Sequence, residues 1–261
     1  NGYRNSLDGA TIVVDPGHGY TGADTFDPGA VGHIKEQEAN LAIAKRVEEK
    51  LKAAGANVIR LKTESETYVT AQRASYARQY NPDLFLAIHC NSAGEDAKGA
   101  EAYYFTPFSQ PLADSISKRV GAYLGSSVHG TGSLDRGENY NYFFVTQQQD
   151  FPSVLIECGF VTNYTEAMAL ANPTHQNGIA SAIVQGASDF LARCDYSCYG
   201  EGSGSFTNSG SYDSTPTESS TSENTAEEVP SETTPSETPE ETASNIGFEY
   251  NPFSDPYNSY Y

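Results

Sequence analysis

The sequence predicts an α/β fold: a single layered domain with a mostly parallel sheet flanked by helices, followed by a disordered acidic tail. Two observations lead to this prediction. Over the first 194 residues, short apolar runs alternate with helical patterns, and strands that alternate with helices are typical of parallel sheets. Beyond Cys194 the chain becomes acidic and poor in apolar residues, which is typical of segments that cannot build a core.

Six short apolar runs, rich in β-branched residues, predict the strands. The runs are nearly continuous rather than alternating, which indicates strands that are covered on both faces. They span Thr11–Asp15, Asn57–Lys62, Asp83–Asn91, Gly99–Phe105, Asn141–Val145 and Ser153–Gly159.

Stretches with apolar residues at every third or fourth position predict the helices. The first apolar stripe runs from Leu41 to Ala54, in a helix expected to begin near Ala39 and to end at Gly55. Two more run from Leu112 to Tyr123 and from Ile179 to Leu191, and a weaker pattern covers Tyr68 to Tyr80.

The tail differs from the rest of the chain in charge and composition. Residues 195–261 hold 13 of the 34 acidic residues and none of the 15 basic ones. Their Ser, Thr, Pro and Glu cannot bury enough surface to offset the entropy of ordering. We therefore expect a catalytic domain over residues 1–194 and a disordered tail over 195–261. The aromatic end, FEYNPFSDPYNSYY, is either a docking segment for a partner or only a sticky end.

Charge and hydropathy exclude two classes of protein. The first 194 residues have 21 acidic against 15 basic residues, so the chain lacks the clustered Lys and Arg of a nucleic-acid binder. No apolar run approaches the roughly 18 residues of a transmembrane segment. The N-terminal NGYRNSLDG also has no signal-peptide core, so the chain is either cytoplasmic or a mature form without its leader.

Four cysteines allow three pairings if all are bridged. Cys194 and Cys198 are four positions apart and could form a local bridge. Cys90 and Cys158 lie in apolar runs, which favours two small buried thiols; a disulfide between them is the alternative. No CxxC pair is present, so a cysteine zinc site is not expected.

Polar side chains follow three of the predicted strands. In parallel α/β sheets, ligands gather at the carboxyl ends of the strands. His18 follows the first strand, His89 and Asn91 end the third, and Glu157 ends the last. Each has a structural explanation alone, as a hydrogen-bonded histidine, for example, or as a helix cap. Together, two histidines and a carboxylate are a ligand set of catalytic zinc sites.

The missing carboxylate ligand should lie near one of these strand ends. Glu36 and Glu38, just before the helix that is expected to begin near Ala39, are the candidates. An acidic residue there is also favoured by the helix dipole alone. His33 is a less favoured alternative ligand.

Five stretches then give the chain a strong resemblance to a known family. IVVDPGHG, KEQEANLAIAKRVEEKLKAAGANVIRLK, DLFLAIHCNSA, GAEAYYF and PSVLIECGFVTN occur in order over about residues 10–193. The chain resembles the zinc-dependent N-acetylmuramoyl-L-alanine amidases, whose catalytic domain is called amidase 3. The resemblance implies one α/β domain with a six-stranded sheet.

The resemblance also implies the roles of individual residues. It makes His18, Glu36 and His89 the ligands of one Zn²⁺ per chain, with Glu36 preferred to Glu38 by its place in the motif. It makes Glu157 the catalytic acid/base. The implied reaction is hydrolysis, by zinc-activated water, of the amide between N-acetylmuramic acid and the L-alanine of the peptidoglycan stem.

Three further residues each have two possible roles. Asp15 is expected either to orient His18 or to cap the turn. Asn91 and Arg136 are candidate substrate-binding residues: Asn91 should face the same side of its strand as His89, and Arg136, expected in a loop, could bind a carboxylate of the peptide stem. Structural hydrogen bonds or a solvated charge are the alternatives.

Two other functions are compatible with the sequence, and the proposed substrate predicts a cellular location. The alternatives are a zinc carboxypeptidase that acts on wall peptides, and a non-catalytic wall-binding protein on the same fold. A wall substrate predicts an extracytoplasmic protein, secreted or wall-associated, an autolysin whose leader is absent from this chain. We expect a monomer.

Overall fold

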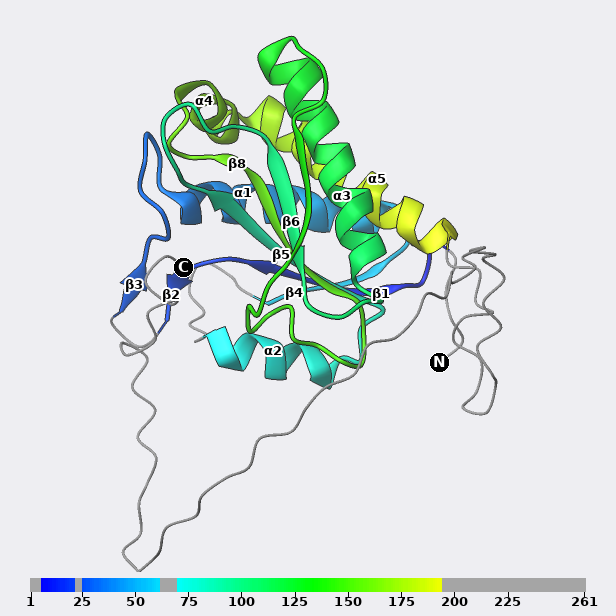
Figure 1. Ribbon diagram of the computed structural model, residues 1–261. Coiled ribbons are helices and arrows are strands. Elements are labelled where there is room, and N and C mark those ends of the chain that lie inside the picture. The colour runs from blue at the N-terminus through cyan, green and yellow to red at the C-terminus, as the bar shows by residue number, and fades with distance from the viewer. Residues whose placement is uncertain (1–5, 22–24, 62–69, 194–261) are drawn as a thin grey trace, which may run out of the picture. The chain divides into compact units, whose positions relative to one another are not determined.

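The strands of the computed structural model form one twisted sheet (Figure 1). The structure describes residues 6–21, 25–61 and 70–193. The sheet strands are β1 (Thr11–Pro16), β4 (Asn57–Arg60), β5 (Leu84–Asn91), β6 (Ala100–Tyr104), β7 (Asp135–Tyr140) and β8 (Ser153–Phe160). Their order is β4-β1-β5-β8-β6-β7. Every neighbouring pair is parallel except β6 and β8, so the predicted mostly parallel six-stranded sheet is confirmed.

The central strands β5 and β8 are buried at every position, as expected for nearly continuous apolar runs in a sheet that is covered on both faces. Their register pairs Ile88 with Ile156 and His89 with Glu157. Strand β6 runs the other way and pairs Glu101 with Glu157. These pairings place polar residues from neighbouring strands in one row across the sheet.

Helices cover the two faces unequally (Figure 1). They are α1 (Glu36–Ala53), α2 (Thr70–Gln79), α3 (Gln110–Tyr123), the π-helix η1 (Leu124–His129), α4 (Tyr164–Ala171) and α5 (Pro173–Arg193). Helices α1, α3 and α5 contribute Ile43, Ile116 and Ile183 to the larger apolar cluster. Helix α2 contributes Ala77 to a smaller cluster with Val145 and other residues of the opposite face.

Several predicted bounds need correction. The strand predicted over residues 141–145 is wrong: β7 lies just before it, at Asp135–Tyr140. As the edge strand of the sheet, β7 is only half-buried and has the polar sequence DRGENY, so it leaves no apolar run. In the aromatic stretch that follows, Val145 is buried while Tyr142 and Phe144 are exposed.

Two helical features also differ from the expectation. Helix α1 begins at Glu36 rather than near Ala39. Helix α4 was not expected; Asn163 caps it, accepting a hydrogen bond from the Glu166 backbone N–H. This short helix has no long apolar stripe, so its start is marked mainly by the cap residue.

A short antiparallel ribbon follows β1. It consists of β2 (Gly19–Tyr20) and β3 (Phe26–Asp27) and pairs Gly19 with Asp27. The ribbon returns the chain toward the end of β1, which places Asp27 beside the loop that contains His18.

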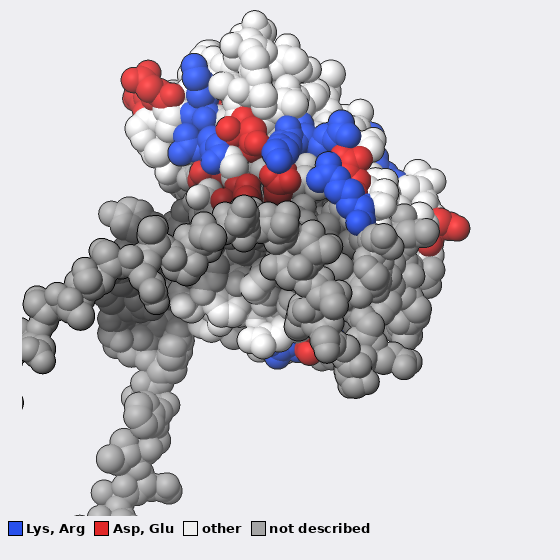
Figure 2. Space-filling view, turned by 45° about the vertical axis from the view of Figure 1, so that its right-hand side comes forward, with Lys and Arg blue, Asp and Glu red and all other residues white. Residues whose placement is uncertain are grey.

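Some expectations concern parts of the chain that the structure does not describe. The tail over residues 195–261, the domain boundary at 194, and Cys194 and Cys198 all lie outside the described residues, so these remain predictions. Among the described helices, none combines the length and apolar character needed to cross a bilayer. On the face drawn in Figure 2, basic side chains alternate with acidic ones.

Candidate active site

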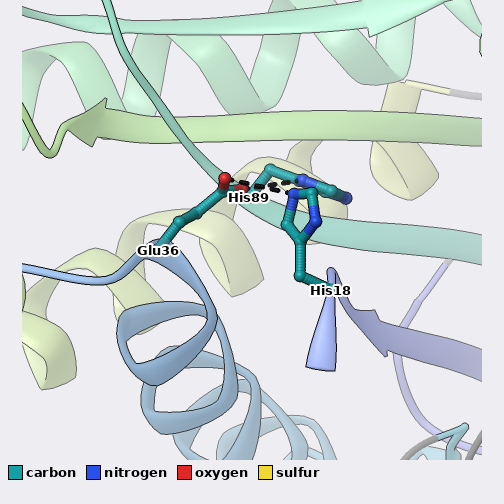
Figure 3. Close-up of side chains that lie close together, drawn as sticks. All are labelled: His18, Glu36 and His89. Carbon is teal, nitrogen blue, oxygen red and sulfur yellow. Dashed lines mark hydrogen bonds and ion pairs between the residues drawn. The ribbon is translucent and has the colours of Figure 1, made fainter. Parts of the chain in front are cut away.

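Residues far apart in the chain meet at one edge of the sheet. Strands β1, β5 and β8 are neighbours, so their carboxyl ends lie together, as the sequence predicts. His18 follows β1, and His89 and Glu157 are direct register partners on β5 and β8. Glu36 projects from the first turn of α1 toward both imidazoles (Figure 3).

His18, Glu36 and His89 form a compact group suited to a metal ion. All three are buried, and one ligand atom of each lies within 4.8 Å of the others. The Nε2 of His18 is 3.1 Å from Oε2 of Glu36, and the Nδ1 of His89 is 2.9 Å from Oε1 of Glu36. Ligand atoms about 2.0–2.2 Å from a tetrahedral zinc ion stand about 3.3 Å apart, so this donor set and spacing fit zinc.

The two alternative ligands lie outside this group. Glu38 is exposed, and its Oε1 is 3.7 Å from the Nζ of Lys35. His33 is exposed and its ring contacts that of Tyr164. Helix α1 turns Glu36 toward the sheet and Glu38 toward solvent, because residues two apart on a helix do not face the same side.

Hydrogen bonds hold the Glu36 carboxylate in place. Its Oε2 accepts from the backbone N–H of Ala30 at 2.8 Å, and its Oε1 accepts from the backbone N–H of Cys90 at 3.1 Å. The buried Asn40 amide also donates to Oε1, at 3.1 Å. The carboxylate is therefore fixed before any ion arrives, which lowers the ordering cost of binding.

The sequence DPGHG at the end of β1 is explained by crowding around these ligands. His18 has a φ of 63°, a left-handed conformation that is uncommon for residues other than glycine. A Cβ at Gly17 would lie 2.2 Å from Cε1 of His89. Gly29, at a φ of +67°, approaches both Glu36 and His18, and a Cβ there would lie 2.5 Å from Oε2 of Glu36. Only glycine therefore fits at these two positions.

Of the two roles expected for Asp15, that of orienting His18 is wrong. Asp15 instead accepts a hydrogen bond at 3.0 Å from Arg73, a buried residue of α2. Arg73 also donates to the backbone carbonyls of Pro16 and His18, at 2.9 and 2.8 Å, and so fixes the loop. Asp27 orients His18: its Oδ2 lies 2.7 Å from Nδ1 of the imidazole.

The charges of the three candidate ligands are coupled. Burial alone would lower the pKa of His18, but hydrogen bonds to Asp27 and Glu36 raise it to about 9. Burial would raise the pKa of Glu36, but its hydrogen bonds to His18 and His89 hold that pKa far below its ordinary value. Burial dominates at His89 and lowers its pKa. Without a metal, the group therefore holds a proton on His18 beside an ionised Glu36.

Glu157 is a buried carboxyl group whose oxygens lack hydrogen-bond partners. It is 1% exposed, and neither oxygen makes a hydrogen bond within the described parts of the chain. Burial, followed by the negative charges of Glu36 and Glu101, raises its pKa well above the ordinary value. A carboxyl group in this environment is suited to general acid/base chemistry.

The two candidate substrate-binding residues both contact Glu101. The Asn91 side-chain amide donates to Oε1 of Glu101 at 2.5 Å, and a bulge between His89 and Asn91 interrupts the expected alternation. Arg136 lies on β7 rather than in a loop, and its Nε donates to Oε2 of Glu101 at 3.0 Å. Glu101 is buried, so Asn91 serves this internal network.

The cysteines inside the domain behave as expected. Cys90 and Cys158 are both buried and unbridged, and both belong to the apolar cluster on the helix-covered face. Burial raises the pKa of each thiol well above its ordinary value. The prediction of two small buried thiols is confirmed.

Sequence reasoning missed four residues that support the site: Asp27, Asn40, Arg73 and Glu101. Asn40 lies one helical turn after Glu36, a spacing that places two side chains on one face, so that signal was available. Arg73 and Asp27 reach the site only through the packing of α2 and of the β2–β3 ribbon, which no local pattern indicates.

Comparisons with known proteins show what the chain is similar to. A family model described as N-acetylmuramoyl-L-alanine amidase matches residues 12–189. The N-acetylmuramoyl-L-alanine amidase LytC of Bacillus subtilis is 36% identical over 192 residues, which cover 71% of this chain and 36% of LytC. The uncharacterized protein YqiI of the same organism is 33% identical, over 69% of this chain and 84% of YqiI. The chain therefore spans only about a third of the length of LytC.

A solved structure shows the same fold. The catalytic domain of CwlV, an N-acetylmuramoyl-L-alanine amidase from Bacillus (Paenibacillus) polymyxa var. colistinus, is 29% identical with a TM-score of 0.60. The match covers 70% of this chain and 98% of that domain.

Proposed function

The chain belongs to the N-acetylmuramoyl-L-alanine amidase family, and we propose that it hydrolyses the amide that joins N-acetylmuramic acid to the L-alanine of the peptidoglycan stem. One observation supports this proposal above the others. His18, Glu36 and His89 converge at the sheet edge, and a buried carboxyl group without hydrogen-bond partners, Glu157, stands on the strand beside His89.

We propose that His18, Glu36 and His89 hold one zinc ion. Two imidazoles and one carboxylate are a common catalytic zinc set, which leaves a further coordination position open. When bound, zinc would polarise the scissile carbonyl, acidify water, and favour the ionised form of Glu157 by its charge. Asp27 would accept a hydrogen bond from the Nδ1–H of His18. This favours the tautomer whose Nε2, the nitrogen that faces Glu36, is unprotonated and free to bind the ion.

In this proposal Glu157 moves the proton. Its carboxylate takes a proton from the attacking water and passes it to the nitrogen of the leaving alanine. The C–N bond of the amide breaks as the water oxygen bonds to the lactyl carbonyl carbon. The products are a lactyl carboxylate on the sugar and a free amino group on the stem. Burial of Glu157 excludes bulk water from the proton transfer.

The remaining assignments follow from the proposed substrate. A peptidoglycan substrate places the enzyme outside the cytoplasmic membrane, secreted or wall-associated, where it would act as an autolysin. Arg136 is the candidate contact for the peptide stem, while Asn91 acts indirectly through Glu101. We expect the chain to work as a monomer, and a partner for the aromatic C-terminal end remains a prediction.

Product analysis of purified muropeptides tests the proposal. The zinc-loaded full chain should release stem peptides with a free L-alanine amino end, detected by mass spectrometry. A chelator should stop the release, and added zinc should restore it. Release of a terminal amino acid would instead indicate a carboxypeptidase. Sedimentation with wall sacs without any product would indicate a non-catalytic wall-binding protein.

A further inference from the structure

A row of polar side chains extends from the candidate metal group across the sheet. His89 on β5 pairs in register with Glu157 on β8, and Glu157 pairs with Glu101 on β6. Arg136 on the edge strand β7 continues the row through its contact with Glu101. The row therefore crosses four neighbouring strands and ends at a guanidinium group on the rim of the sheet.

Three contacts fix the position of the Arg136 side chain. Its Nε donates to Oε2 of Glu101 at 3.0 Å. Its guanidinium carbon lies 5.0 Å from the centre of the Phe160 ring. Its aliphatic part passes over Gly99, where a Cβ would lie 3.2 Å from Cγ of Arg136. A guanidinium that is held at Nε and stacked on a ring is preorganised, because little conformational freedom is left to lose on binding.

The partner carboxylate is itself held by other donors. Glu101 is 6% exposed, and its Oε1 accepts from the Asn91 amide and from the Tyr103 hydroxyl, at 2.5 and 2.9 Å. Glu101 is therefore a buried residue that positions Arg136 and does not itself need to contact a substrate. Its other oxygen, Oε2, holds the Nε of Arg136.

The outer end of Arg136 is available to a ligand. The side chain is 43% exposed, and within the described residues neither terminal nitrogen of the guanidinium makes a hydrogen bond. Two such nitrogens on one planar group match the two oxygens of a carboxylate. A guanidinium that is fixed in this way, at the end of the row of polar side chains, is suited to bind an anionic group of a substrate selectively.

We propose that Arg136 selects stem peptides whose second residue carries a free carboxylate. This inference rests on the proposed function. Neighbouring strands are about 4.8 Å apart, and an extended peptide advances about 3.3 Å per residue. One strand spacing separates Glu157 from Glu101, to which Arg136 is bound, and two separate β8 from β7. The guanidinium therefore lies about 5–10 Å from the proton-transfer group, which two residues of an extended stem span.

Two substrates that differ in one group test this inference. One is N-acetylmuramoyl-L-alanyl-γ-D-glutamyl-L-lysine; the other carries an amide in place of the glutamyl α-carboxylate. The zinc-loaded wild type should cleave the acid with a kcat/KM about tenfold or more above that of the amide. Arg136→Ala should bring the ratio to within about twofold of one. Arg136→Lys should lose most of the preference, because an ammonium cannot form the paired hydrogen bonds.

A matched control separates recognition from structural support. Arg119→Ala removes another half-exposed arginine that is paired with a carboxylate, Asp189, between α3 and α5, and it should keep the wild-type ratio. If Arg136→Ala lowers kcat/KM equally for both substrates, Arg136 only supports the sheet edge and the inference is wrong.

Binding to an inactive variant keeps this test independent of the reaction. Zinc-loaded Glu157→Gln should bind the acid about tenfold or more tightly than the amide by calorimetry, and Glu157→Gln with Arg136→Ala should bind them equally. A preference in binding without hydrolysis by the wild type would support the inference while rejecting the proposed reaction. Equal binding of both peptides by Glu157→Gln would overturn the inference whatever the wild type cleaves.

Discussion

The Oδ2 of Asp27 lies 2.7 Å from Nδ1 of His18, and this contact explains why a short ribbon follows the first strand. The register pair Gly19–Asp27 brings the carboxylate back to the imidazole. The second oxygen of Asp27 accepts from the backbone N–H of Gly29 at 2.9 Å, which fixes the carboxylate. A histidine held at Nδ1 presents Nε2 in a defined direction, here toward Glu36.

Asp27→Asn should therefore weaken metal binding without removing a ligand. Loss of an oriented carboxylate behind a ligating histidine typically costs about 10–100-fold in metal affinity. Competition with a chromogenic zinc chelator would measure the change. Asp189→Asn, which removes a surface carboxylate paired with Arg119, is the control and should keep the wild-type affinity. Equal affinity of Asp27→Asn and wild type would show that Asp27 does not support His18.

The contrast between Asp15 and Asp27 shows what could be predicted from the sequence. The two candidate histidine ligands lie at strand ends, which the sequence indicates because apolar runs stop there, and Glu36 lies at a helix start. Asp15 is three residues from His18, so proximity in sequence suggested a partner. The actual partner depends on the β2–β3 ribbon, whose two-residue strands carry no apolar periodicity. The aromatic stretch after β7 led to the wrong strand prediction over residues 141–145, because exposed aromatic residues look like a buried strand in sequence.

Gly17→Ala should disrupt the metal group more than the fold. The added methyl group would meet the His89 ring, with three ring atoms within 2.7 Å of the new Cβ, so the imidazole must move. We expect zinc affinity to fall about tenfold or more, while far-UV circular dichroism is retained. Gly94→Ala is the matched control, because no atom lies within 4 Å of a Cβ at that position. A wild-type affinity for Gly17→Ala would show that His89 tolerates displacement.

The raised pKa of His18 predicts opposite effects of pH on the metal-free and metal-bound proteins. The folded-state pKa is about 9 against 6.5 for the free side chain. The stabilisation of the metal-free protein from this group, about 3 kcal/mol, is therefore complete below about pH 6.5 and is lost as the pH rises through 9. Urea unfolding of the metal-free protein at pH 6, 8 and 9.5 should show this decline.

Zinc binding should instead strengthen over the same range. A metal ligand must be unprotonated, so binding releases the His18 proton and apparent affinity rises as pH increases toward 9. Calorimetry in two buffers of different ionisation enthalpy would count the released protons, with at least one, from His18, expected at pH 7. Binding without proton release would contradict the assignment of His18 as a ligand. His18→Gln should remove the stability change and lower the number of protons released per bound zinc by about one.

The buried thiols should be inert in the folded protein. Cys90 and Cys158 are 2% and 0% exposed, and burial raises the pKa of both, so little reactive thiolate is present at pH 8. Iodoacetamide should label these two residues only after unfolding, as read by peptide mapping. Labelling of either one in the native protein at the rate of a free thiol would show that the strands around the site open.

Glu157→Gln should separate function from stability. We expect hydrolysis to be abolished because the amide cannot accept the proton of the attacking water, while metal analysis still finds close to one zinc ion per chain. Turnover at the wild-type rate would reject the role of Glu157.

The pKa of Glu157 is raised above the ordinary 4.5, so its ionisation destabilises the fold as the pH rises above that value. The metal-free variant should therefore melt above the wild type at pH 8, and this difference should shrink toward pH 4.5. If the difference in melting temperature between wild type and variant were the same at pH 8 and pH 4.5, Glu157 would ionise in the folded protein as freely as in water.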